Sequence, residues 1–104
     1  MTVEMKRATH KCQPSARQAL AAALVSISEP QEMEAFLAEL LTRGELCDVT
    51  LRWQLIELLS RGVSQRKIAE ELQISLCKIT RGSRILKNKK SISGKIVKQF
   101  GVKD

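Results

Sequence analysis

Hydrophobic residues recur along the chain at intervals of three and four, the spacing of an α-helix, and show no convincing strand alternation. The pattern predicts an all-α fold of about six short helices. The first helix begins at Pro14, a residue that suits a first helical turn, and continues to Ile27, where the sequence SISEP breaks the pattern. A second, amphipathic helix carries an apolar stripe of Met33, Phe36, Leu37, Leu40 and Leu41.

The third predicted helix, about Glu45 to Arg61, has two apolar stripes instead of one. A helix that is apolar over most of its circumference is packed between neighbours, so we expect this one to be the central helix. Gly62 ends it. One stripe holds Val49, Trp53 and Ile56, and the other holds Leu51, Leu55 and Leu58.

Residues 64–87, with the sequence SQRKIAEELQISLCKITRGSRILK, predict two short helices joined by a tight turn. Ser64 and Ser75 are suitable N-caps, because a serine hydroxyl can accept from a free backbone N–H of the first turn. Gln73 stands where glycine usually adopts the left-handed turn conformation. A residue other than glycine costs about 1 kcal/mol at such a position. Small and apolar residues are spaced as in a helix-turn-helix with steeply crossing helices: Ile68, Ala69, Leu72, Ile74 and Ile79.

The two ends of the chain differ in character. Residues 1–13 are polar, basic and aperiodic, and predict a flexible arm. After the linker KNKK, a last short amphipathic helix is outlined by Ile92, Ile96, Val97 and Phe100. Residues 14–104 therefore form one predicted helical domain.

The formal net charge is +7, and it is unevenly distributed. Residues 28–63 carry a net charge of −4, whereas residues 64–104 hold eleven basic and three acidic side chains, a net charge of +8. Positive charge concentrated around a helix-turn-helix favours binding of double-stranded DNA. We expect Leu76, Cys77, Lys78 and Thr80 to reach base edges, and Gln65, Arg66, Arg84 and Lys87 to contact phosphates.

Other chemistry has little support in the sequence. Cys12, Cys47 and Cys77 are odd in number and far apart, which argues against disulfides or zinc and favours a reducing cytoplasm. His10 is the only histidine, and no pair of carboxylates or nucleophile with a base stands out. No apolar run approaches the roughly 18 residues of a membrane span. We therefore expect neither catalysis, nor a metal site, nor membrane insertion.

The run from Ile79 to Ser83, ITRGS, and the preceding SQR at 64–66 resemble the tryptophan repressor family. Upstream, ELLTRGELCDVTLRWQLIELL is similar to the second and third helices of that family, so the resemblance covers residues 36–87. It implies a homodimer of interleaved helices that binds a palindromic DNA operator. It also implies L-tryptophan as corepressor, bound between the central helix and each recognition helix.

The residues that match the family's ligand set are Thr42, Arg52 and Arg81. Two guanidinium planes can sandwich an indole ring, and one of them, with a threonine hydroxyl, can bind the carboxylate. Gly82, expected to face the surface, would leave room for the ring. A leucine at that position is then expected to block the ligand and leave the fold nearly intact.

Two departures from the family leave the identity of the ligand undetermined. Ile85 and Leu86 stand where the family typically offers a small hydroxyl for the ligand's amino group, and Arg84 replaces a usual asparagine. The ligand is tryptophan, another indole or amino acid, or absent. The alternatives are a related regulator without a small-molecule switch, a small DNA-binding subunit of a transposase, and a purely structural helical module. Such a transposase subunit usually ends in a heptad helix, which residues 88–104 lack.

Overall fold

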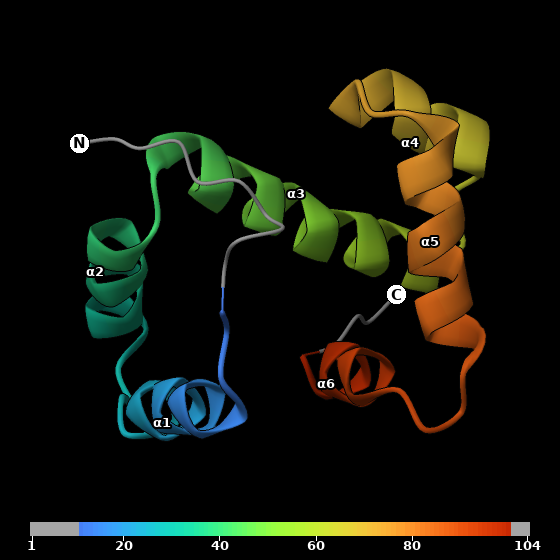
Figure 1. Cartoon of the computed structure of the whole chain (residues 1–104). Helices are drawn as coiled ribbons and strands as arrows, with labels where there is room; N and C mark the ends of the chain where they lie inside the picture. Colours follow the sequence, from blue (N-terminus) through green and yellow to red (C-terminus); the bar gives the residue numbers. More distant parts are fainter. Residues whose placement is uncertain (1–10, 101–104) are drawn as a thin grey trace. The chain divides into compact units, whose positions relative to one another are not determined.

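Six α-helices and no strand make up residues 11–100, the part of the chain described by the structure, a computed structural model (Figure 1). The predicted all-α fold is confirmed. Contacts divide the chain into two units, the first ending at Leu40 and the second beginning at Leu41. Most of the predicted arm lies outside the described residues. Within residues 11–100, no helix has the length and apolar composition that crossing a membrane requires.

The first unit consists of α1 (Pro14–Val25) and α2 (Pro30–Leu40), and each helix begins at a proline. The SISEP break is confirmed, although α1 ends two residues before Ile27. Neither helix contains a buried residue. Val25 is 83% exposed and Leu40 is 51% exposed. The apolar stripes of this unit are therefore only partly covered in a single chain: Met33, Phe36 and Leu37 are half-buried, whereas Leu40 is exposed.

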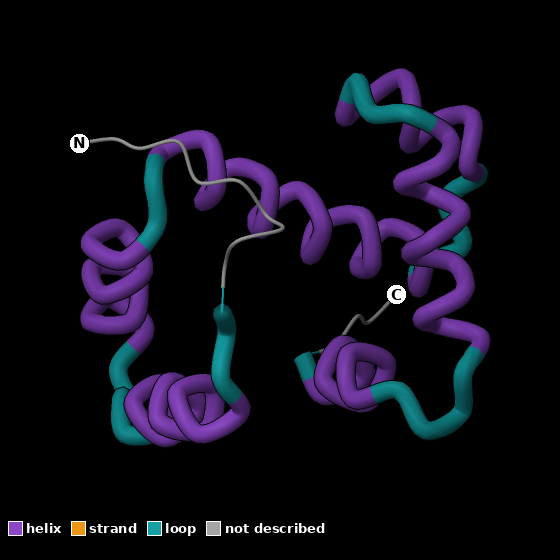
Figure 2. The backbone as a smooth tube through the Cα atoms, in the orientation of Figure 1, coloured by secondary structure: helices purple, strands orange, loops and turns teal. Residues whose placement is uncertain are grey.

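The second unit consists of α3 (Arg43–Ser60), α4 (Gln65–Leu72), α5 (Leu76–Lys87) and α6 (Ile92–Gln99). Helix α3 contacts each of the other three, which confirms that it is the central helix. Figure 2 shows the short connection between α4 and α5 and the longer one before α6.

A hydroxyl caps the N-terminus of every helix in the second unit. Thr42 accepts a hydrogen bond from the backbone N–H of Glu45 (3.1 Å), whose carboxylate accepts from the Thr42 N–H (2.9 Å), completing a capping box. The predicted caps Ser64 and Ser75 are confirmed, accepting at 3.2 and 3.3 Å. Ser91 caps α6 at 3.0 Å. Each cap contributes about 1 kcal/mol, so short-range sequence signals determine where these helices begin.

The core of the second unit joins α3, α4 and α5 through Leu55, Ile68 and Ile79. Ile68 and Ile79 are fully buried, and Leu55 is 3% exposed. Burying side chains of this size is worth roughly 2 to 3 kcal/mol each, so this cluster holds α5 against α3. The partly buried residues around it are Leu58, Leu59, Val63, Ala69, Leu72 and Ile74.

Candidate functional site

The turn between α4 and α5 has the conformation predicted from its sequence. Gln73 adopts φ 56° and ψ 46°, the left-handed region that glycine would occupy at no steric cost. Ile68 on α4 and Ile79 on α5 are both fully buried, and the two helices are in contact. The helix-turn-helix therefore has the core and the turn that its spacing indicates.

All eight side chains expected to contact DNA are exposed. At 100° per residue, Cys77, Thr80 and Arg84 lie on the side of α5 away from the buried Ile79 and Gly82. This side is accessible along the helix. The full set is Gln65 and Arg66 on α4 and Leu76, Cys77, Lys78, Thr80, Arg84 and Lys87 on α5.

Lys78 is separated from the rest of this set. It is about 160° around α5 from Thr80, so the two side chains leave the helix in nearly opposite directions. Lys78 instead lines a cavity beside α3, together with Arg81 and Ile85. The structure thus divides the predicted base-reading residues between two surfaces.

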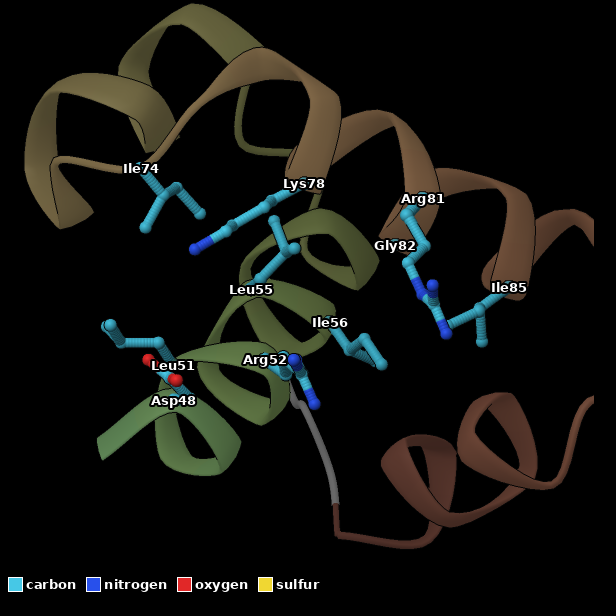
Figure 3. Close-up of a pocket in the computed structure, with 10 residues that line it drawn as sticks. All are labelled: Asp48, Leu51, Arg52, Leu55, Ile56, Ile74, Lys78, Arg81, Gly82 and Ile85. Carbon is cyan, nitrogen blue, oxygen red and sulfur yellow. The ribbon is translucent and has the colours of Figure 1, made fainter. Parts of the chain in front are cut away.

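The cavity lies between α3 and α5 and has a volume of about 320 Å³, a size typical of small-molecule sites. Arg52 and Arg81, predicted to hold one ligand, both line it (Figure 3). Leu55 belongs both to the lining and to the buried core. The other lining residues are Asp48, Leu51, Ile56, Ile74, Lys78, Gly82 and Ile85.

The expectation that Gly82 faces the surface is wrong. Gly82 is buried, and a β-carbon added to it would lie 2.8 Å from Cδ2 and 3.1 Å from Cγ of Leu55. The same β-carbon would lie 3.4 Å from Cδ1 of Leu59. The glycine permits a close approach of α5 to α3. The clue in the sequence is its position between Ile79 and Leu86 at helical spacing, on the apolar stripe of α5.

Thr42, the remaining predicted ligand residue, caps α3 and does not line the cavity. Its ligand contact stays a prediction. Sequence reasoning missed the cavity roles of Asp48 and Lys78. Helical spacing contains the signal for both, since Asp48 is four residues before Arg52 and Lys78 is three before Arg81.

Comparison with known proteins identifies the family. The family model described as Trp repressor protein matches residues 15–100, most of the chain. This chain belongs to the Trp repressor family. The match includes the helix-turn-helix and every residue that lines the cavity.

Two curated relatives support this assignment. Both are described as Trp operon repressor homolog, one from Chlamydia trachomatis serovar L2 and one from serovar L2b. Each is 39% identical to this chain over 70 residues, which are 62% of this chain and 74% of the relative. The search of solved structures gave no significant match. Membership in the Trp repressor family makes this chain a transcriptional repressor by class and favours that reading over a transposase subunit.

Proposed function

We propose that this Trp repressor family member binds an operator in double-stranded DNA through α4 and α5, as a homodimer activated by L-tryptophan. The observation that carries the proposal is the cavity. The two arginines that match the family's ligand set come from different helices and meet in one cavity, against the recognition helix α5.

The charge of the second unit supports DNA binding. Residues 64–104 carry a net charge of +8, and Arg66, Arg84 and Lys87 are exposed on the helix pair. Basic side chains on such a surface release counterions from DNA and supply most of the non-specific affinity. Thr80 and Cys77, on the exposed side of α5, are then placed to reach base edges.

The composition of the cavity supports an aromatic ligand. Its apolar surface comes from leucine and isoleucine side chains of α3, of α5 and of the turn before α5, and Arg52 and Arg81 contribute planar cations that stack on aromatic rings. Arg81 and Ile85 lie on the recognition helix itself. A ligand held between α3 and α5 therefore favours one orientation of α5, and this coupling links ligand affinity to operator affinity.

The partly uncovered apolar stripes of α1 and α2 support a homodimer. Neither helix buries a residue within one chain, and Leu20, Val25 and Leu40 are exposed. A second copy related by a two-fold axis would cover these apolar side chains and present two recognition helices to a palindromic site.

A mobility-shift titration on DNA from the chain's own operon, with and without L-tryptophan, tests the proposal. We expect operator affinity to rise with tryptophan at fixed salt. DNA binding that does not respond to tryptophan would favour the second candidate, a family member without a small-molecule switch. Ile85 is the observation behind that candidate, because it gives the cavity an apolar side chain where the family typically has a hydroxyl.

A further inference from the structure

We propose that four lysines beyond the helix-turn-helix form a second surface for DNA, which binds the phosphate backbone next to the segment held by α5. They are Lys89 and Lys90, in the turn after α5, and Lys95 and Lys98, on α6. This inference rests on the DNA binding proposed above and does not depend on the ligand. It extends the DNA contact beyond α4 and α5.

The four lysines line one open groove between the end of α3, the end of α5 and α6. All four side chains are exposed. The groove has a volume of about 1180 Å³, larger than a typical small-molecule site, and no acidic residue lines it. A wide groove whose charged side chains are all positive suits a polyanion.

The sequence around the groove offers no carboxylate that could neutralise these lysines. Nine basic residues and no acidic residue occur between Glu71 and Asp104. Neighbouring charges of one sign repel each other, and a bound polyanion relieves that repulsion. Lysine is also a common phosphate-binding residue, acting as a point charge.

The groove continues the basic end of α5. Lys87 is in the last turn of that helix, and Lys89 follows two residues later. Asn88 holds the turn, since its Oδ1 accepts from the backbone N–H of Lys90 (2.9 Å) and its carbonyl oxygen accepts from that of Ser91 (3.0 Å). Figure 1 shows α6 following α5 through this connection. The turn therefore presents its lysines beside a residue already expected to contact phosphate.

A homodimer leaves the lysine side of α6 accessible. Ile92 and Phe100 are 71% and 72% exposed and lie on either side of the half-buried Ile96, a stripe that a second copy can cover. At 100° per residue, the direction midway between Lys95 and Lys98 is about 130° around the helix from Ile96. DNA and a second copy would then use different sides of α6.

Anisotropy titrations of mixed-sequence duplex DNA without tryptophan, over a range of salt concentrations, test this surface. Each lost phosphate contact reduces the slope of log affinity against log salt by about one unit. The double variant Lys95→Gln/Lys98→Gln is therefore expected to reduce it by about two units, and Lys89→Gln/Lys90→Gln by the same amount. Lys95→Arg/Lys98→Arg keeps both charges and should keep the slope.

Arg17→Gln/Arg43→Gln is the matched control. It also removes two exposed positive charges, one from α1 and one from the start of α3, outside the groove. We expect the slope of this variant to equal that of the wild type.

Several outcomes would overturn the inference. An unchanged slope in either lysine-to-glutamine variant, while Arg84→Ala reduces it, would refute the second surface and leave the proposed DNA binding intact. An equal reduction in the control would attribute the effect to net charge, and a reduction in Lys95→Arg/Lys98→Arg would attribute it to the fold. A lower mass by light scattering in the lysine-to-glutamine variants would assign the groove to a second copy. A wild type that binds no DNA would overturn the proposed function as well.

Discussion

Gly82 of α5 lies so close to Leu55 of α3 that an added β-carbon would be 2.8 Å from Cδ2 of the leucine. Leu55 is 3% exposed and is held by the core, so it has little freedom to move away. The contact determines how closely α5 approaches the central helix α3, and with it the width of the cavity that both residues line.

Gly82→Leu is expected to lower the free energy of unfolding by at least about 2 kcal/mol, because overpacking outweighs the gain in helix propensity. Urea denaturation at fixed protein concentration measures this loss of stability. Gly44→Ala is the control: apart from its chain neighbours and the backbone of its own helix, no atom lies within 4 Å of its added β-carbon, so we expect no loss of stability. If Gly82→Leu is as stable as the wild type, the close approach of α5 to α3 is wrong.

Gln73→Gly is expected to stabilise the fold by up to about 1 kcal/mol. Glycine removes the steric cost of φ 56° and adds a smaller entropic cost in the unfolded chain. Gln54→Gly, at an exposed position inside α3, should instead destabilise by about 1 kcal/mol. Thermal or urea unfolding of both variants gives the comparison, and a loss of stability in both would contradict the left-handed turn.

Arg84→Ala is expected to weaken binding to all DNA sequences alike and to reduce the salt dependence by about one unit of slope, as for loss of one phosphate contact. Thr80→Val should instead change the preference among operator sequences. Fluorescence anisotropy over a range of salt concentrations separates the two effects. Arg43→Ala removes an exposed charge outside the helix pair and should change neither the salt dependence nor the sequence preference of DNA binding. If Arg84→Ala alters sequence preference, the faces of α5 have been assigned wrongly.

Arg81→Ala is expected to cost about 2 kcal/mol in tryptophan binding, roughly thirtyfold, because it removes a stacking cation from the cavity. At a fixed tryptophan concentration below saturation, the tryptophan-dependent gain in operator affinity should shrink because less of the protein carries the ligand, while binding without ligand persists. Calorimetry and mobility shifts on one preparation measure both quantities. An unchanged gain at that concentration despite weaker tryptophan binding would break the proposed coupling.

The homodimer predicts a mass of about twice 11.7 kDa by light scattering at micromolar concentration. Leu40→Glu should shift the equilibrium toward the monomer, since it puts a charge on the apolar stripe of α2. Gln31→Glu adds the same charge to α2 at a polar, exposed position and should leave the mass unchanged. A monomeric wild type would remove the basis for a palindromic operator.

The features that could be predicted from the sequence are local. A serine hydroxyl caps a helix three residues away, and the turn at Gln73 depends on its immediate neighbours, so Ser64, Ser75 and Gln73 were predicted correctly. Periodicity also identified α3 as central, because two apolar stripes require neighbours on two sides.

The features that could not be predicted depend on how two helices cross. Helical spacing puts Gly82 on the apolar stripe of α5, between Ile79 and Leu86, but the close approach to Leu55 depends on how α5 crosses α3. Similarly, helical spacing puts Lys78 on the same side of α5 as Arg81, but only the crossing of α3 and α5 makes that side line a cavity. Thr42 matches a ligand residue by sequence, whereas its hydroxyl is engaged by the Glu45 backbone in the structure.

Leu55 is shared between the core and the cavity, and this sharing limits how ligand specificity can evolve. A change at Leu55 alters the fold and the ligand at the same time, so few substitutions there are tolerated. Asp48, Lys78 and Ile85 also line the cavity but are exposed or half-buried, and they can vary at little structural cost. New corepressors are therefore expected to arise through these outer positions, in lineages that keep the leucine and Gly82 together.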